Sequence, residues 1–306
     1  MFTFGLIGYG KWGKNYFKIL NEFSNNKIIK FLYLARLKLN KKSKQISSSQ
    51  IKLINTKSLF EKKINGLIIS SPPQTHFELS KKAISKKIPT LIEKPLTLNL
   101  ESTLNIKKLL YKKKILFLVN HQYLMSPYYK ELKKIINNKN ISKIYSEGHG
   151  IGPKRNYSVL WDWAPHDLSM RFDLLGTKKR VNILKVKKNT SVKGFERWKI
   201  EMYVGNIFVA ISIGNNYKRK TRIFKVFEKN GNITIFNDRN ISNYKLKFNN
   251  KCIRVQHSLP LQNKILIFLK YLKKYYNKNN NINYMKDINL SLKIAKCIEK
   301  IYYFKD

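Results

Sequence analysis

Three glycines near the start of the chain constrain its fold more than any other feature. An apolar run of strand length ends at Gly8, and the glycines follow as Gly8-x-Gly10-x-x-Gly13. A helical pattern then begins at once, and the residues spaced to share its apolar face are Trp12, Tyr16, Phe17 and Leu20. In a strand–turn–helix unit, such glycines permit a tight turn, the approach of a pyrophosphate and close packing of helix on strand. The motif predicts a dinucleotide site, and a glycine-rich turn without a ligand is the alternative.

The turn itself is the expected cofactor contact. Its N–H groups and the positive end of the following helix dipole would face the phosphates. We therefore expect cofactor contacts from Gly8, Gly10, Lys11, Trp12 and Gly13.

The end of the next predicted strand, 27–36, bears on the choice between NAD and NADP. A Rossmann fold normally carries an acidic residue there, which holds the ribose 2′-hydroxyl. This chain carries Arg36, and the lysines that follow it are Lys38, Lys41 and Lys42. Because a planar guanidinium pairs well with phosphate oxygens, Arg36 favours NADP over NAD. The alternative is a solvated basic residue in a chain that has many of them.

The order of predicted elements indicates the fold class. Strands and helices alternate through residue 119, which is typical of a parallel, doubly wound sheet. Beyond Gly176 the pattern changes to strand-like runs with polar turns, followed by amphipathic helices at 261–276 and 287–303. We therefore predict an α/β protein, with an N-terminal Rossmann sheet followed by an α+β domain with a large open, mostly antiparallel sheet. The expected domains are an NAD(P)-binding domain at 1–120 and a substrate-binding domain at 121–306.

Charge and cysteine content narrow the choice of partners. The formal net charge of +45 would by itself suggest nucleic acid, but it is mostly Lys spread along the chain, so we expect no specific nucleic-acid partner. Cys252 and Cys297 are too few for a disulfide framework and lack metal-ligand spacing, so no metal site is predicted. The N-terminus lacks a signal-peptide pattern, and no apolar run reaches the ~18 residues of a membrane span. We expect a cytoplasmic protein with no membrane contact.

Three signatures in order make residues 1–125 resemble the N-terminal domain of the Gfo/Idh/MocA oxidoreductases (glucose–fructose oxidoreductase, inositol dehydrogenase and MocA). They are the glycine motif, Ser71-Pro72-Pro73-Gln74-Thr75-His76 and Glu93-Lys94-Pro95. The resemblance implies a catalytic Lys94 at the reacting hydroxyl and a cis bond before Pro95. It also implies cofactor contacts from Ser71, Pro72, His76, Glu93 and Lys94. The alternative for Glu93-Lys94-Pro95 is a strand-ending turn with an exposed Lys.

A second chemical stretch contains Asp162 and His166, four residues apart at a predicted helix entrance. This spacing lets both side chains point at one cavity. A carboxylate near an imidazole orients it and raises its basicity, as a general base requires. The family has this Asp-x-x-x-His pattern, and the resemblance implies that His166 works with Lys94 while Asp162 orients one of them. The alternatives are helix capping by Asp162 or Asp167 and a packed His under two Trp rings.

Further substrate contacts are expected around these groups. Residues 120–128 resemble the crossing segment of the family, which often carries Arg where this chain has Tyr123 and Leu124. Arg155 is a candidate partner for a phosphate or carboxylate, with a solvated side chain as the alternative. The predicted substrate-binding residues are Lys94, Gln122, Tyr123, Arg155, Asp162 and His166.

These features predict an NAD(P)-dependent oxidoreductase. It would transfer a hydride between the nicotinamide and a hydroxyl or carbonyl carbon of a sugar, nucleotide sugar or polyol. The alternatives are an oxidoreductase for a nonsugar carbonyl or imine, a dinucleotide-binding sensor or partner that has lost catalysis, and a basic polyanion-binding protein. The resemblance also implies that the open sheet face is an oligomer interface, so we expect a homo-oligomer, dimer or tetramer.

Overall fold

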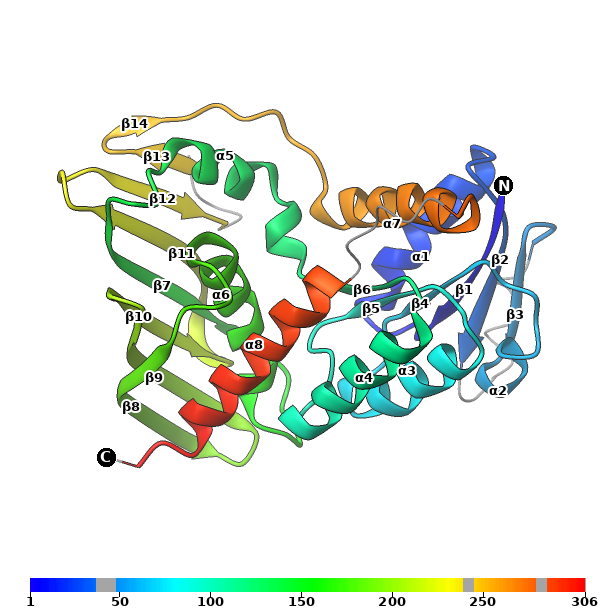
Figure 1. Ribbon diagram of the computed structural model, residues 1–306, viewed down its shortest axis with the longest axis horizontal. Helices are drawn as coiled ribbons and strands as arrows, with labels where there is room; N and C mark the ends of the chain where they lie inside the picture. Colours follow the sequence, from blue (N-terminus) through cyan, green and yellow to red (C-terminus); the bar gives the residue numbers. More distant parts are fainter. Residues whose placement is uncertain (37–47, 239–244, 279–284, 306) are drawn as a thin grey trace. The chain divides into compact units, whose positions relative to one another are not determined.

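The computed structural model describes residues 1–36, 48–238, 245–278 and 285–305 (Figure 1). Lys38, Lys41 and Lys42 lie outside the described residues. The chain divides into two compact units, Met1–Asn120 with Leu261–Asn289 and His121–Pro260 with Leu290–Asp306. The first unit therefore differs from the expected domain of 1–120, because it also takes up residues 261–289.

The first unit contains a six-stranded sheet in the order β3-β2-β1-β4-β5-β6, and the described strands pair in parallel. This is the strand order of a Rossmann fold. Its strands are β1 (Phe2–Ile7), β2 (Ile29–Arg36), β3 (Ile51–Asn55), β4 (Gly66–Ile69), β5 (Thr90–Glu93) and β6 (Phe117–Asn120). Its helical segments are α1 (Gly13–Asn25), α2 (Thr56–Leu59), η2 (Pro73–Thr75), α3 (His76–Ser85), α4 (Leu100–Lys113) and α7 (Pro260–Tyr276).

Two apolar cores form on opposite faces of this sheet. On one face, α1 and α7 pack over β1 and β2, and the α7 residues that join this core are Leu261, Ile265, Phe268, Leu269 and Leu272. The Phe268 ring meets Phe4 edge-on at 5.9 Å. On the other face, α3 and α4 bury Ala83, Ile84, Ile106 and Leu110. Both faces are therefore covered, as a parallel sheet requires.

The second unit contains an eight-stranded sheet in the order β14-β13-β12-β11-β7-β10-β9-β8. Its strands are β7 (Ile141–Ile151), β8 (Val181–Val192), β9 (Phe195–Val204), β10 (Ile207–Gly214), β11 (Asn216–Glu228), β12 (Ile233–Asn237), β13 (Leu246–Phe248) and β14 (Lys251–Cys252). Between the described strands, β7 with β10 is the one parallel pair. The predicted fold class is confirmed: a parallel Rossmann sheet is followed by a mostly antiparallel one.

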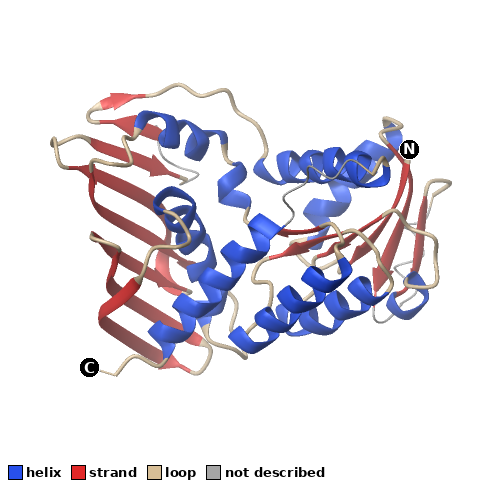
Figure 2. Ribbon diagram, in the orientation of Figure 1, coloured by secondary structure: helices blue, strands red, loops and turns tan. Residues whose placement is uncertain are grey.

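The helical segments of the second unit are η3 (Gln122–Met125), α5 (Pro127–Ile135), α6 (Val159–Leu175) and the greater part of α8 (Met285–Tyr302). They lie on one face of the eight-stranded sheet (Figure 2). Strand β9 alternates buried and exposed residues along its length, so its other face is open to solvent. In the described part of the chain, no helix is long and apolar enough to cross a membrane.

Helix α6 begins earlier than its sequence pattern indicates: it starts at Val159 and includes Pro165, whereas the pattern suggests a helix that starts after Asp167. Glu196 on β9 stabilises this earlier start. Its Oε2 accepts hydrogen bonds from the Val159 N–H over 2.9 Å and from the Ser158 hydroxyl over 2.8 Å. A carboxylate at this position satisfies helix N–H groups and complements the positive end of the dipole. Asp162 and His166 are therefore helical residues, rather than residues at the entrance to a later helix.

Candidate active site

The glycine motif forms a close-packed turn between β1 and α1. Gly8 has a φ of +100°, and a Cβ there would lie 2.6 Å from the backbone nitrogen of Ser71. A Cβ on Gly13 would overlap the carbonyl oxygen of Gly8, whereas one on Gly10 would meet no atom within 4 Å. Gly8 and Gly13 are thus required by the turn itself. Gly10 is exposed beside open space, so the fold alone does not require a glycine there.

Arg36 lies next to this turn. The N–H of Gly8 donates to the carbonyl of Ala35 over 3.3 Å, which brings the end of β2 beside the motif. The Arg36 guanidinium lies 5.9 Å from the centre of the Tyr9 ring, and the Lys14 ammonium lies 6.0 Å from the same ring. Two cationic side chains therefore flank Tyr9 at the position where a Rossmann fold receives the adenosine ribose.

Glu93 links the glycine motif to Glu93-Lys94-Pro95. Its Oε1 accepts from the Trp12 indole N–H over 2.7 Å, the Tyr16 hydroxyl over 2.6 Å and the Asn120 amide over 2.7 Å. Its Oε2 accepts from the Lys94 N–H over 3.2 Å. Burial, reinforced by the Glu93 charge, raises the pKa of Tyr16 well above its usual value, so this hydroxyl remains a donor.

His76 links the second motif to the third. Its Nδ1 lies 2.7 Å from the carbonyl oxygen of Pro95, and its Nε2 lies 3.0 Å from that of Ser71. Burial lowers the pKa of His76 to about 4, so the ring is neutral near pH 7 and one nitrogen donates. The Lys94–Pro95 peptide bond is cis, and Lys94 is half-buried.

The three motifs therefore converge at one edge of the sheet. Gly8, Ser71 and Lys94 follow the carboxyl ends of β1, β4 and β5, which is where open α/β sheets bind their ligands. Pro72 immediately precedes η2, and Lys11 is exposed in the glycine turn. This edge presents a helix N-terminus, N–H groups and a half-buried Lys, a set of groups that could hold a dinucleotide.

In the second unit, α6 carries Asp162 and His166 one turn apart. The Arg155 guanidinium donates to Asp162 Oδ2 through Nε, over 2.9 Å, and through Nη2, over 2.5 Å. The structure thus pairs Asp162 with Arg155, which places two predicted substrate residues together. The half-buried His166 ring meets the Tyr123 ring edge-to-face, at 5.1 Å and 87° between planes.

Tyr123, a predicted substrate residue, is largely buried in the second unit. Only 8% of it is exposed, and its hydroxyl donates to Asp238 over 3.2 Å. Burial raises the pKa of Tyr123, so the hydroxyl stays protonated. Gln122 begins η3, the same short helix. The largely buried Tyr123 ring therefore contacts His166 from the protein interior. Lys94 belongs to the first unit and His166 to the second.

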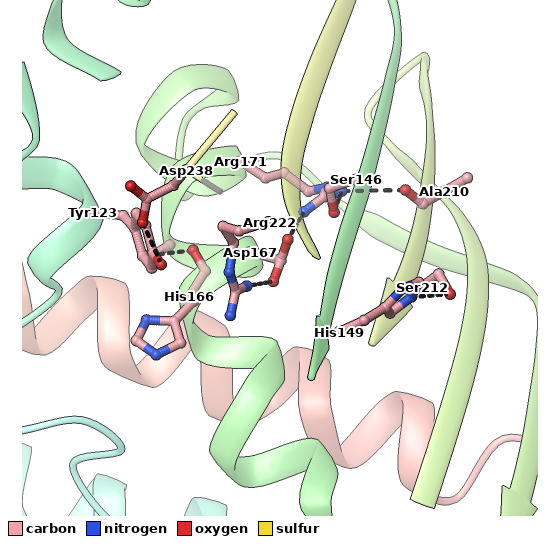
Figure 3. A network of polar contacts seen from close by, with 11 residues as sticks. Tyr123, Ser146, His149, His166, Asp167, Arg171, Ala210, Ser212, Arg222 and Asp238 are labelled. Carbon is pink, nitrogen blue, oxygen red and sulfur yellow. Dashed lines mark hydrogen bonds and ion pairs between the residues drawn. The ribbon is translucent and has the colours of Figure 1, made fainter. Parts of the chain in front are cut away.

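A buried charge cluster near His166 was not predicted (Figure 3). Asp167 Oδ2 accepts from Arg222 Nη1 over 2.7 Å, and its Oδ1 lies 3.9 Å from Arg171 Nη1. Arg171 also donates to Ser146 Oγ and to the carbonyl of Ala210. Burial lowers the pKa of Arg171 to about 10. Burial acts in the same direction on Arg222, but the neighbouring Tyr123 and Asp167 outweigh it and raise its pKa.

The sequence contains one signal for this cluster. Asp167 lies four residues before Arg171 on helix α6, and a buried carboxylate needs a cationic partner. Its partner Arg222 lies 55 residues away on β11, and no local pattern sets it apart from the other basic residues. His149 projects from the opposite face of β7 to Gly148, hydrogen-bonds Ser212 Oγ over 2.7 Å and stacks on Tyr217 at 3.9 Å.

Comparisons with solved structures identify the fold over nearly the whole chain. A protein from Magnetospirillum magnetotacticum MS-1 is 22% identical, with a TM-score of 0.82 over 97% of this chain and 98% of that one. UDP-N-acetylglucosamine 3-dehydrogenase GnnA from Acidithiobacillus ferrooxidans is 14% identical, with a TM-score of 0.73 over 98% and 96%. Biliverdin reductase from Synechocystis sp. PCC 6803, solved with biliverdin and NADP+, is 14% identical, with a TM-score of 0.77 over 98% of both chains.

No curated protein sequence matches the chain. At these identities the solved structures establish a shared fold and nothing finer about activity. A comparison of the sequence with family models gives a finer result: residues 2–121 match the model of the oxidoreductase family with an NAD-binding Rossmann fold, GFO_IDH_MocA. The resemblance carried by the three motifs is thereby confirmed: the N-terminal part of the chain, residues 2–121, matches the model of the Gfo/Idh/MocA oxidoreductase family.

Proposed function

We propose that this protein is an NAD(P)-dependent oxidoreductase that transfers a hydride between the nicotinamide and a hydroxyl or carbonyl carbon of a sugar, nucleotide sugar or polyol. The observation that carries the proposal is the convergence of the three motifs at the carboxyl edge of the six-stranded sheet. There, Glu93 and His76 hold the glycine turn, the Ser71 turn and the Lys94 turn together. Such an edge binds dinucleotides in Rossmann folds.

The cofactor supplies the hydride chemistry, and the protein supplies binding, orientation and proton transfer. We assign the proton at the reacting hydroxyl to Lys94 and His166, as the family resemblance implies. Asp162 is assigned to orient one of these two groups and to contact the substrate together with Arg155, with which it shares two hydrogen bonds. Gln122 and Tyr123, neighbours in η3, are the further proposed substrate contacts, and the Tyr123 ring also packs against His166.

NADP is favoured over NAD in this proposal. Arg36 and Lys14 flank Tyr9 beside the glycine turn, where two cations would complement a ribose 2′-phosphate. Neither cation would gain a comparable partner from the free 2′-hydroxyl of NAD.

The sugar class rests on family resemblance and on one solved structure of this fold, a UDP-N-acetylglucosamine 3-dehydrogenase. A nonsugar carbonyl substrate is the second candidate, because a biliverdin reductase also has this fold. A panel of sugars, nucleotide sugars and polyols, assayed beside linear tetrapyrroles with NADPH or NADP+, separates the two. Turnover of tetrapyrroles alone would contradict the sugar assignment.

The experiment that tests cofactor binding is a fluorescence titration with NADPH and NADH at moderate and at high salt. We expect saturable binding that persists at high salt, since nonspecific polyanion binding falls steeply as salt rises. Arg36→Ala should remove the NADPH preference, whereas Lys30→Ala, an exposed residue of the same strand, should not. If neither cofactor binds once salt has screened the charge, the oxidoreductase proposal fails.

We also propose that the protein is a homo-oligomer, dimer or tetramer, formed through the open face of the eight-stranded sheet. Tyr203 is 40% exposed on this face and meets Phe208 edge-to-face, which leaves aromatic surface available for a second copy. Light scattering after gel filtration should show Tyr203→Glu shifting to a smaller species. Tyr111→Glu, at an exposed position of α4, serves as the control, and an unchanged mass for Tyr203→Glu would contradict this interface.

A further inference from the structure

Arg222 occupies a seat that is built for a guanidinium group. We define the Arg222 seat as Gly148 and Gly150 of β7 with Trp163 and Asp167 of α6. Within it, Asp167 accepts from Arg222 Nη1 over 2.7 Å, and the Trp163 ring centre lies 5.6 Å from the guanidinium carbon. The Arg222 side chain is 7% exposed and that of Asp167 is fully buried. The pair is therefore an interior feature and not a surface ion pair.

The two glycines make room for this arrangement. A Cβ on Gly148 would lie 2.5 Å from Arg222 Nη1 and 2.9 Å from Asp167 Oδ2. A Cβ on Gly150 would lie 2.9 Å from the Trp163 indole. Because alternate residues of a strand face the same side, both glycines open the helix-covered face of β7 at adjacent positions. Any side chain at Gly148 would displace the ion pair, and any side chain at Gly150 would displace the indole.

The Arg222 guanidinium is connected to His166 by the Tyr123 ring, which contacts both. Its carbon lies 5.2 Å from the centre of the Tyr123 ring, within the range of a cation–π contact. The same Tyr123 ring meets the His166 imidazole edge-to-face at 5.1 Å. Asp238 accepts from the Tyr123 hydroxyl, so the far end of the ring is held as well (Figure 3). Arg222, Tyr123 and His166 therefore form a continuous row of contacts.

We propose that Arg222 is a positioning residue for His166: seated between Gly148 and Asp167, it fixes the Tyr123 ring against which the imidazole packs. Arg222 need not touch substrate or cofactor, because it acts through Tyr123. The catalytic meaning of this role rests on the proposed function of His166. The row of contacts itself does not depend on that function.

Arg171 separates this role from simple charge balance. It is also fully buried near Asp167, but its guanidinium donates to Ser146 and Ala210 and lies 5.3 Å from the Phe224 ring. Arg171 thus joins helix α6 to the sheet, away from Tyr123. If Arg222 served only to neutralise Asp167, it would not need to lie against the Tyr123 ring, which in turn contacts His166.

The test is nuclear magnetic resonance of the full chain labelled with ¹³C at its five histidines. The His166 imidazole signal is assigned by its loss in His166→Gln. We expect Arg222→Met and Gly148→Ala to shift this signal and its titration midpoint, with Gly148→Ala leaving every charge in place. Arg219→Met, at an exposed position on the same strand β11, is the matched control and should leave the signal unchanged.

A second pair of variants tests the intermediate ring. Tyr123→Leu removes the edge-to-face contact and should shift the His166 signal, whereas Tyr123→Phe keeps the ring and should shift it much less. A His166 signal unchanged in folded Arg222→Met and Gly148→Ala would overturn the proposal. Should both fail to fold, Arg222→Lys, which keeps the charge but loses the planar fork, replaces them: a shifted His166 signal is expected, and an unchanged one would overturn the proposal. Because no cofactor or substrate is added, this outcome is independent of the NADPH titration.

Discussion

The indole N–H of Trp12 donates to Oε1 of Glu93 over 2.7 Å, joining two motifs that lie 81 residues apart in the sequence. Trp12 is the N-cap residue of α1, so this hydrogen bond fixes the start of the helix that follows the glycine turn. The same carboxylate accepts the N–H of Lys94. One buried acid thus sets both the expected phosphate site and the backbone of the expected catalytic Lys.

Trp12→Phe should weaken NADPH binding while the protein stays folded. The variant keeps an aromatic side chain but loses a hydrogen bond to a charged group, and a loss of about 1 kcal/mol corresponds to roughly fivefold in affinity. Fluorescence titration measures this change, with Tyr111→Phe at an exposed site as the control. Unaltered NADPH affinity in Trp12→Phe would show that the hydrogen bond does not order the turn.

The three glycines of the motif should respond differently to alanine. Gly13→Ala places its Cβ against the Gly8 carbonyl, so the free energy of unfolding should fall by about 1–3 kcal/mol. Gly10→Ala meets open space, so stability should change by less than about 0.5 kcal/mol. NADPH affinity in Gly10→Ala should nevertheless fall roughly tenfold or more, because the Cβ occupies the path of the pyrophosphate. Urea unfolding and NADPH titration of both variants measure the contrast, and equal behaviour would contradict it.

His76 should make stability depend on pH. Its pKa is about 4 in the folded chain and near 6.5 in the unfolded one, so the unfolded state binds more protons between these values. Stability from this group is complete above about pH 6.5 and is lost as the pH falls toward 4. We expect a loss of about 2 kcal/mol between about pH 7 and about pH 5.

Urea unfolding at these two pH values compares the wild type with His76→Gln and with His257→Gln. The His76→Gln variant should lack this component of the pH dependence, whatever its baseline stability. His257 is exposed, so its replacement should leave the dependence intact. An identical pH dependence in all three proteins would mean that His76 titrates normally in the folded state.

Lys94→Ala and His166→Ala should each lower kcat by about 10²–10⁴-fold, the usual contribution of a positioned proton-transfer group. Because His166 is not among the expected cofactor contacts, NADPH affinity in His166→Ala should remain close to that of the wild type. Steady-state turnover of a substrate found by the panel gives kcat, and titration gives the affinity. Full turnover in both variants would remove Lys94 and His166 from the proposed chemistry.

The first half of the chain was predictable because its determinants are local. The glycine spacing places the end of β1 and the start of α1, and the structure has the predicted alternation of strands and helices through β6. The convergence of the motifs at one edge also follows, since parallel strands share that edge. The hydrogen bonds that Tyr16 and Asn120 donate to Glu93 were not predicted. Tyr16 belongs to the apolar face of a helix and Asn120 to the end of a strand, and neither pattern indicates a polar partner.

The remainder depends on contacts between distant residues. Helix α6 begins at Val159, where the local N-cap Ser158 is joined by Glu196, a residue of strand β9 that lies 37 residues away in the sequence and accepts from the Val159 N–H. The return of α7 to the first unit is invisible in its amphipathic pattern, which specifies an apolar face but not the surface it covers.

That return has a consequence for synthesis on the ribosome. The core that α7 shares with β1 and α1 cannot close until residues 261–272 have been made, although β1 is among the first residues translated. The nascent Rossmann sheet must therefore wait with Phe4 and its neighbours uncovered while the entire antiparallel sheet is produced. A chain released near residue 120 should need a chaperone to stay dispersed, since exposed apolar surface promotes aggregation.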